Sequence, residues 1–214
     1  MNNNLITTAE TTQIRRALEK DIPQIVDICR TGFVNSLRWN GLRMIALKWW
    51  SSAITTDSAE VWVMLRNGTV AGFTVLVFNE EKWKSEKKIK YGRLMNFLNV
   101  MVNPVFVIRR MVQKRKHVKL CRNYHNSIDV EISMPVSERC WIELIAVKDD
   151  YRGCGIGREL IYHCFGIAID RGKKLISLTV NVLNEKAISL YKKCGFKSVN
   201  YVNNKIIMVK VLKS

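Results

Sequence analysis

The stretch that decides the fold is Asp150-Tyr-Arg-Gly-Cys-Gly-Ile-Gly157, which lies between a strand-like run at residues 141–147 and a helix-like run that starts at Arg158. A glycine-rich turn of this kind exposes backbone N–H groups at the positive end of a helix dipole, where anionic oxygens bind. Because glycine has no Cβ, Gly155 and Gly157 let a phosphate approach the backbone closely. The segment therefore predicts a pyrophosphate site.

Two common phosphate loops do not fit this segment. A P-loop needs Lys and then Ser or Thr after its last glycine, but Gly157 is followed by Arg158 and Glu159. A dinucleotide loop needs Gly-x-Gly-x-x-Gly, and no glycine occupies its last position here. What remains is Arg-x-x-Gly-x-Gly over residues 152–157, with a glycine-rich helix start that binds no ligand as the alternative.

A second pattern follows downstream. Residues 175–182 alternate between apolar and polar side chains, as a half-buried strand does. Next comes Asn184-x-x-Ala-x-x-Leu-Tyr191-x-x-x-Gly195-Phe, in which Asn184 suits a helix N-cap and Gly195 suits the residue after a helix end. Together the two patterns resemble the two signatures of the GNAT acetyltransferases, in the family's order. The resemblance covers residues 141–211 well and residues 14–78 more loosely.

This resemblance implies acetyl-CoA as the co-substrate and a set of residues that would hold it. The N–H groups of the glycine-rich loop would cradle the pyrophosphate, and the end of the fourth strand would pair with the pantetheine arm, because the family's fourth and fifth strands splay apart there. A backbone N–H near Ile145 would also face the oxyanion. Asn184 would contact the coenzyme from the opposite wall, with helix capping as its alternative role. The expected coenzyme-binding residues are Ile145, Ala146, Val147, Arg152, Gly153, Cys154, Gly155, Ile156, Gly157, Arg158 and Asn184.

Two side chains are candidates for the chemistry of acetyl transfer to an amine. Tyr191 matches the family's proton donor; since a thiol has a pKa near 8.5 and a phenol near 10, its help would be useful rather than obligatory. Glu143 is the candidate base, acting through a water, and simple strand alternation places it on one face with Trp141, Ile145 and Val147. The alternatives are a tyrosine packed on the sheet and a glutamate that orients the acceptor or pairs with a basic side chain.

The remaining segments predict the rest of the fold. Asp21-Ile-Pro23 predicts a helix start capped by Asp21, and Asn67-Gly68 predicts a two-residue hairpin turn. We expect strands at residues 14–17, 60–65 and 69–78, helices at 21–40 and 42–54, and a final hairpin over 196–212 that turns at 203–204. The predicted fold class is α/β (α+β), a GNAT-like mixed, mostly antiparallel twisted sheet flanked by helices, with one domain over residues 13–214 after a flexible polar tail, 1–12.

Residues 80–139 depart from the family pattern, which has a short link before the fourth strand. This predicted helical insertion is strongly basic, for example at Lys82-Trp-Lys84, Arg109-Arg110 and Lys114-Arg-Lys116. Its apolar part, residues 94–107, contains Pro104, which predicts a break between two helices. Three roles stay open: a wall of the acceptor pocket, contact with an anionic membrane surface or another polyanion, and structural packing.

Composition narrows the remaining choices. The chain has 214 residues, enough for one domain with a full core, and its net charge of +17 suits either polyanion binding or a solvated basic surface. The sequence contains no apolar run long enough for a membrane span and its start has no signal-peptide pattern. Its six cysteines form no Cys-x-x-Cys pair and its three histidines have no metal-ligand spacing. We therefore expect reduced thiols, no metal and a cytoplasmic location.

These features predict an N-acetyltransferase that acts on the primary amine of a small metabolite, with a nucleotide-linked amino sugar of surface-polysaccharide biosynthesis as the first candidate. One alternative is a protein or peptide N-acetyltransferase, which would need an acidic groove that this basic chain does not suggest. Another is a non-catalytic module that binds coenzyme A and a polyanion. No nucleic-acid partner is favoured, and the sequence makes no prediction of the oligomeric state.

Overall fold

The computed structural model describes residues 11–33, 36, 39, 42–90, 134–202 and 204–213, with the backbone alone for 87–90. Its centre is a seven-stranded sheet in the order β1-β2-β3-β4-β5-β7-β6. All neighbouring strands are antiparallel except β4 and β5, which are parallel. This confirms the mixed, mostly antiparallel sheet. The strands are β1 Thr12–Arg16, β2 Ala59–Arg66, β3 Thr69–Val77, β4 Arg139–Val147, β5 Leu175–Asn181, β6 Lys197–Val202 and β7 Lys205–Val211.

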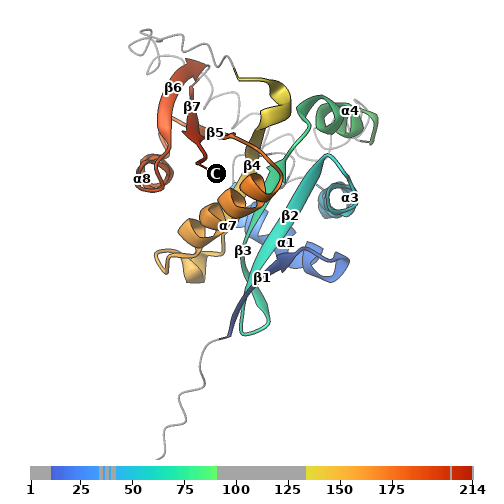
Figure 1. The fold of residues 1–214 in the computed structure, drawn as a ribbon. Helices are drawn as coiled ribbons and strands as arrows, with labels where there is room; N and C mark the ends of the chain where they lie inside the picture. Colours follow the sequence, from blue (N-terminus) through green and yellow to red (C-terminus); the bar gives the residue numbers. More distant parts are fainter. Residues whose placement is uncertain are drawn as a thin grey trace, which may run out of the picture.

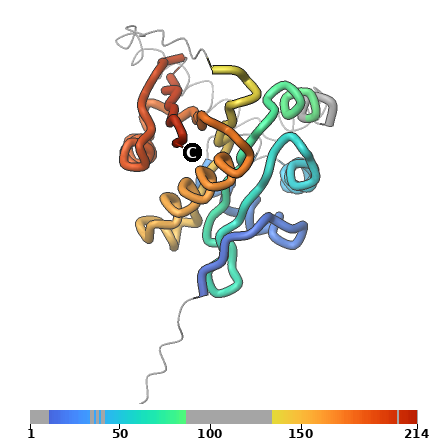
Figure 2. The backbone as a smooth tube through the Cα atoms, in the orientation of Figure 1, coloured from blue at the N-terminus to red at the C-terminus, as the bar shows by residue number. Residues whose placement is uncertain are grey.

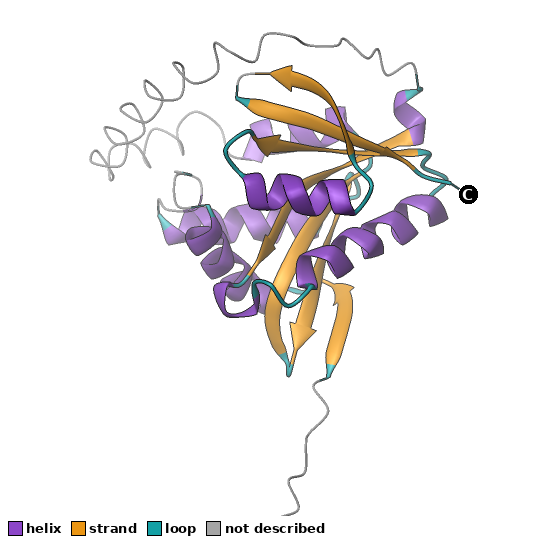
Figure 3. Cartoon of the chain, turned by 90° about the vertical axis from the view of Figure 1, so that its left-hand side faces the viewer, coloured by secondary structure: helices purple, strands orange, loops and turns teal. Residues whose placement is uncertain are grey.

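Helices cover both faces of this sheet (Figures 1 and 3). One apolar cluster packs α1 and α3 against β2 and β3, and a second packs α7 and α8 against β4, β5 and β7. The first strand, β1, lies at one edge of the sheet, and the last two strands, β7 and β6, lie at the opposite end (Figure 2). The helices are α1 Ile22–Gly32, α3 Arg43–Ile54, α4 Glu80–Lys90, α7 Ile156–Asp170 and α8 Glu185–Lys193, with short 3-10 turns η1 Glu19–Asp21, η3 Val136–Glu138 and η4 Asp149–Tyr151.

The β2–β3 hairpin follows its sequence pattern closely. Val61 and Val63 face the α1/α3 cluster, whereas Met64 packs with the first turns of α7 on the other face. Asn67 and Gly68 have φ angles of 50° and 76°, the left-handed pair that a two-residue hairpin turn requires. This hairpin places β3 beside β4, the strand on which the candidate site is built.

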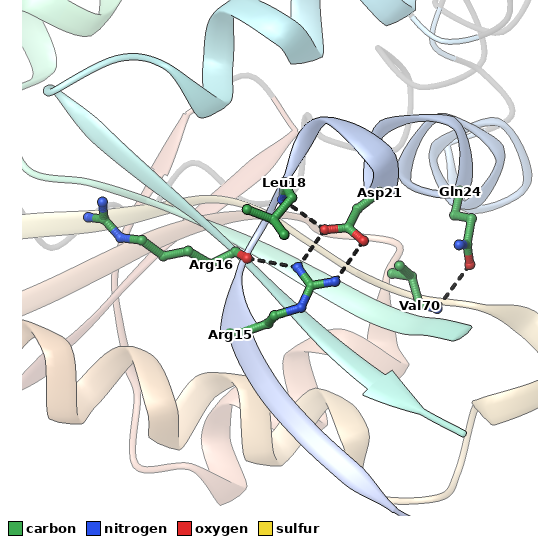
Figure 4. Close-up of polar contacts among 6 residues, drawn as sticks. All are labelled: Arg15, Arg16, Leu18, Asp21, Gln24 and Val70. Atoms are coloured by element: carbon green, nitrogen blue, oxygen red, sulfur yellow. Dashed lines mark hydrogen bonds and ion pairs between the residues drawn. The ribbon is translucent and has the colours of Figure 1, made fainter. Parts of the chain in front are cut away.

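The start of α1 differs from its prediction. Asp21 makes no side-chain cap hydrogen bond to α1; its carboxylate instead accepts hydrogen bonds from Arg15 Nη1 (2.6 Å), Arg15 Nη2 (2.9 Å) and the N–H of Leu18 (2.8 Å) (Figure 4). Burial raises the pKa of Asp21, but these hydrogen bonds outweigh it and hold the pKa below its usual value. Gln24 Oε1 accepts from the N–H of Val70 at 2.9 Å, which links α1 to β3 (Figure 4).

Helix α1 ends at Gly32 with a turn at Phe33, earlier than predicted, and most of residues 34–41 lie outside the described part. The basic insertion begins as α4, whose Trp83 is buried 6.1 Å from Trp49 and whose Glu86 accepts hydrogen bonds from Thr56 and Ser58. Its first turns are therefore packed on the α3 side of the sheet. The predicted break at Pro104 and most of the basic clusters lie outside the described residues.

The C-terminal elements match their predictions with one addition. The strand at residues 175–181 buries Ile176, Leu178 and Val180, and the final hairpin is present as β6 and β7. Strand β7 also inserts between β5 and β6, so the last strand of the chain pairs with β5. Strand β5 therefore lies between β7 and β4, and its β4 side is the side of the candidate site.

Candidate active site

Strands β4 and β5 are parallel neighbours that separate along their length. They pair from Arg139↔Leu175 to Ile142↔Leu178 and no further, while β5 continues beside β7 as far as Asn181. Residues 144–147 of β4 therefore pair only with β3 among the described strands. The splay that the family resemblance implied is present, and it exposes one backbone edge at Ile145, Ala146 and Val147.

The separation begins at a β-bulge in β4. On β3, Val75 pairs with Leu144 and Leu76 pairs with Ile142, so Glu143 is the extra residue. A bulge bends its strand and shifts the alternation of side chains by one position. Accordingly, Trp141 and Leu144 pack toward the α1/α3 cluster, and Ile145 packs toward α7 and α8. The prediction that residues 141, 143, 145 and 147 share one face is therefore wrong.

The glycine-rich loop follows β4 directly. The N–H of Lys148 donates to Ala71 O at 2.8 Å and fixes the strand end, and η4 then leads into the loop. Gly153 and Gly155 both have φ of 84°, a conformation that side-chain-bearing residues rarely adopt. Gly155 O accepts hydrogen bonds from the first turn of α7. The N–H groups of Gly155, Ile156 and Gly157 donate to no acceptor among the described residues, so they remain available for an anion.

Close packing brings the start of α7 against its neighbours. A Cβ on Gly157 would lie 3.2 Å from Leu190 Cδ2 of α8 and 3.7 Å from Val147 Cγ2 of β4. A Cβ on Gly72 of β3 would lie 3.0 Å from both Ala146 O and Ile156 Cγ2. The loop, the end of β4 that does not pair with β5, and α8 therefore meet at one place. Sequence reasoning missed Gly72, because no local pattern marks a glycine that is needed for packing against a distant helix.

Tyr191 lies in the apolar cluster on the α7/α8 side of the sheet, the cluster against which Ile145 also packs. Its side chain is buried, and its ring meets that of Phe196 edge-on at 5.9 Å. Burial raises the pKa of Tyr191 to about 12, so the phenol keeps its proton at neutral pH. The side chain is packed on the sheet, which was the alternative to a role as proton donor. A phenol that keeps its proton is also compatible with that role.

Glu143 lies on the other side of the split. Its half-buried Oε2 accepts a hydrogen bond of 3.2 Å from Nε1 of Trp141, and Trp141 packs against the α1/α3 cluster. Tyr191 packs against the α7/α8 cluster instead. The two candidate catalytic residues thus belong to opposite faces of the sheet where β4 and β5 part.

The other predicted residues are less closely placed. Asn184 Oδ1 accepts from the N–H of Ala187 at 3.2 Å and caps α8, and no contact places its exposed side chain against the loop. Arg152 is ion-paired with Asp149 at 2.7 Å, and its guanidinium lies near Gly32 at the end of α1. Cys154 and Arg158 are exposed. Their roles stay predictions from the resemblance.

A pocket of about 320 Å³ lies between α1 and the start of the loop. It is lined by Gln24, Asp27, Ile28, Thr31, Val70, Lys148, Asp149 and Asp150. None of Glu143, Ile145 or Tyr191 lines it, so it is separate from the split between β4 and β5. In the described part of the chain, no group of three or more His, Cys, Asp or Glu residues is arranged to hold a metal, and no helix is both long and apolar enough to cross a membrane.

Known proteins are similar to this chain in the segment that contains the candidate site. A sequence model of the Acetyltransferase (GNAT) family matches residues 118–196, which contain the loop, the end of β4 and Tyr191. The match spans somewhat more than a third of the chain and identifies this segment as a GNAT acetyltransferase domain. It is 41% identical over 69 residues to an uncharacterized N-acetyltransferase of Methanocaldococcus jannaschii, covering 32% of this chain and 30% of that protein. It is 38% identical over 56 residues to the peptidyl-lysine N-acetyltransferase YjaB of Escherichia coli, covering 26% and 35%. The chain thus matches about a third of the length of these curated relatives.

Solved GNAT structures share the fold over nearly the whole chain. The PaiA N-acetyltransferase of Thermoplasma acidophilum, solved in complex with coenzyme A, superposes with a TM-score of 0.55 over 94% of this chain and 99% of that one, at 13% identity. GNAT enzymes use acetyl-CoA. The loop fits that co-substrate, because it combines two left-handed glycines with three N–H donors that have no acceptor among the described residues.

Proposed function

We propose that this chain is an acetyl-CoA-dependent N-acetyltransferase that acts on the primary amine of a small metabolite. The observation that carries the proposal is the meeting of three features: N–H groups at the start of α7 without an acceptor among the described residues, the end of β4 that does not pair with β5, and a buried Tyr191 in the cluster against which Ile145 packs. Glu143 on the opposite face supports the assignment. The family provides the reaction class, and the split provides a place where a coenzyme and an acceptor can approach from different sides.

The residues would divide the work as follows. Acetyl-CoA supplies the acetyl group as a thioester, so a C–N bond forms and a C–S bond breaks. The N–H groups of Gly155, Ile156 and Gly157 would bind the pyrophosphate, and a backbone N–H near Ile145 would donate to the carbonyl oxygen as it gains charge. Glu143 would take a proton from the attacking amine, directly or through a water. Tyr191 would give its proton to the departing sulfur, and both residues would then exchange protons with solvent.

Calorimetry with acetyl-CoA tests the coenzyme site. Gly155→Glu should raise the Kd for acetyl-CoA at least about a hundredfold above a micromolar value, because it strains the loop and places a carboxylate beside the phosphates. Gly172→Glu is the matched control: Gly172 also has positive φ, 66°, but it follows the far end of α7 and a Cβ there would meet nothing within 4 Å. This control should bind normally. A native chain that does not bind acetyl-CoA would overturn the proposed function.

For the acceptor, we propose a nucleotide-linked amino sugar. The net charge of +17 would attract its diphosphate, and an amino-sugar amine loses its proton more readily than a lysine side chain does. Release of free coenzyme A thiol should be measured with UDP-glucosamine and with glucosamine, which has the same amine and no diphosphate. A higher kcat/KM for UDP-glucosamine supports the proposal, and equal values contradict it.

Acetylation of peptidyl lysine is a second candidate, because the E. coli relative carries that name. A lysine-containing peptide in the same assay would reveal it. The non-catalytic alternative is tested by the variants Tyr191→Phe and Glu143→Gln. A binding module would bind acetyl-CoA in every form and acetylate none of the amines, whereas an enzyme would lose turnover in the variants and keep its affinity for acetyl-CoA.

A further inference from the structure

The hydrogen bond between Trp141 and Glu143 joins two residues of one strand across the β4 bulge. In a strand, residues two apart point to the same face, so long side chains at these positions can contact each other. Here Glu143 is the extra residue of the bulge, and its Oε2 lies 3.2 Å from the indole Nε1 of Trp141. The carboxylate is thus held where β4 leaves β5, one residue past the last paired position, Ile142.

The indole that holds Glu143 is itself fixed by packing. Trp141 is half-buried against the α1/α3 cluster, which contains Trp49, Trp50 and Phe73 in edge-on contacts with ring centroids 4.9 to 5.1 Å apart. Its backbone pairs with Val77 of β3. A ring anchored in this way has few alternative rotamers, so its N–H offers the carboxylate a donor in a constant position.

The chemistry of the indole suits this task. An indole N–H donates a hydrogen bond and cannot accept one, and it does not ionise at ordinary pH. It can therefore orient a carboxylate without taking the proton that the carboxylate is to receive. A basic side chain in the same place would bring a positive charge close to the amine that must become neutral.

We propose that Trp141 is a positioning residue for acetyl transfer: its indole N–H holds Glu143 in the orientation that receives the acceptor's proton. The inference rests on the proposed function and adds to it a residue that no signature of the family marks. Because a misplacement of about 1 Å at a reacting group can cost up to about a hundredfold in rate, a hydrogen bond that sets this orientation is expected to matter for turnover.

The chain contains a matched control for this inference. On β2, Trp62 Nε1 donates to Glu60 Oε2 at 2.9 Å, again between residues two apart on one strand. Glu60 is buried and ion-paired with Arg16 and Arg171, and it lies on β2, which β3 separates from β4. Trp62→Phe removes the same kind of hydrogen bond as Trp141→Phe, at a site without a role in the proposed chemistry.

The test is a double-mutant cycle on the full chain, with kcat/KM measured for UDP-glucosamine and for a lysine-containing peptide and acetyl-CoA affinity measured by calorimetry. Trp141→Phe should lower kcat/KM about tenfold, which is the loss of one hydrogen bond to a charged group. Glu143→Gln should lower it about a hundredfold, the lower end for a general base. The double variant should be no worse than Glu143→Gln, because the indole acts only through the carboxylate. Acetyl-CoA affinity should not change, and Trp62→Phe should leave kcat/KM unchanged.

Additive losses in the double variant, or an equal loss in Trp62→Phe, would overturn the inference and leave the proposed function standing. A native chain that acetylates neither probe would overturn both. A Trp141→Phe variant that misfolds would fail to bind acetyl-CoA. In that case Glu143→Asp tests the inference, because the shorter side chain keeps a carboxylate but withdraws it from the indole. A tenfold loss in Glu143→Asp supports the inference, and full activity contradicts it.

Discussion

The two tryptophan–glutamate pairs on β2 and β4 share one local geometry and differ in everything around it. In each pair an indole N–H donates to a carboxylate two residues away, at 2.9 Å for Trp62–Glu60 and 3.2 Å for Trp141–Glu143. Glu60 sits in a regular strand, is 6% exposed and binds two arginines. Glu143 sits in a bulge, is half-buried and stands at the edge where β4 loses its neighbour.

The difference shows what turns a carboxylate into a candidate catalytic group. The two arginines of Glu60 come from the end of β1 and the end of α7, so its charge joins distant parts of the fold. A carboxylate that is paired with two guanidinium groups in this way has a structural role. Glu143 lies where β4 stops pairing with β5, and the indole of Trp141 donates a hydrogen bond to it. The same pair motif therefore serves structure in β2 and, we propose, chemistry in β4.

The largest expected difference is in turnover. Glu143→Gln should reduce kcat about a hundredfold, because an amide cannot accept the acceptor's proton. Glu60→Gln, assayed at a temperature where it is folded, should keep kcat within about twofold, because Glu60 lies outside the split. The check is the rate of free thiol release from acetyl-CoA. Equal losses in both variants would show that the two pairs do not differ in function.

For stability, we expect the Glu60 variant to lose more than the Glu143 variant. Glu60→Gln leaves two guanidinium groups without their carboxylate and should lower the free energy of unfolding by about 2 kcal/mol, less than for a fully buried pair because both arginines are partly exposed. Glu143→Gln should change it by less than about 0.5 kcal/mol. Urea unfolding followed by circular dichroism measures both. A larger loss in Glu143→Gln would mean that the β4 pair is the structural one.

The opposite face of the split should contribute less than Glu143. Tyr191→Phe removes a phenol whose pKa burial raises to about 12, and kcat should fall about tenfold, since a thiolate leaves without strict need of a proton donor. Acetyl-CoA affinity measured by calorimetry should stay the same. Tyr162→Phe on α7 is the control, because that ring is 51% exposed and packs at 5.8 Å from Phe165. A loss in both variants would contradict a specific role for Tyr191.

The smallest expected effect is a change in how stability depends on pH, caused by His163 beside the Trp62–Glu60 pair. His163 lies edge-on to Trp62 at 4.4 Å, and its buried Nε2 has no hydrogen-bond partner among the described residues. Burial lowers the pKa of His163, although the charge of Glu60 acts in the opposite direction. The unfolded histidine binds a proton below about pH 6.5 and the folded one only at lower pH, so stability is full above that pH and falls as the pH drops through it.

His163→Gln should remove this part of the acid sensitivity. Melting temperatures of the native chain and the variant, compared at pH 7.5 and pH 5.5, provide the check: the native chain should lose more on acidification. Other titrating groups are common to both proteins, so the difference isolates His163. An equal loss in the two proteins would show that the buried ring does not contribute.

Short-range patterns were read correctly from the sequence. The cap at Asn184, the turn at Asn67-Gly68 and the alternation in residues 175–181 all depend on neighbours within a few positions. Asp21 was read wrongly, because a carboxylate before a helix can cap it or accept from an arginine six residues earlier, and only the folded chain decides which. The roles of Tyr191, Glu143 and the loop residues stay proposals that the experiments above address.

The sequence by itself determined the glycine-rich loop, the order of strands and helices around it and the resemblance to the GNAT family, because each depends on residue types at fixed spacings along the chain. Only the tertiary structure decided how the site is assembled. The bulge at Glu143 depends on the register between β3 and β4, strands that are separated in sequence by the whole insertion. The close approach of α7 depends on Gly72 of β3, and the pairing of Glu143 with an anchored indole depends on the aromatic cluster beneath it. Contacts between distant segments set these features, and no local pattern encodes them.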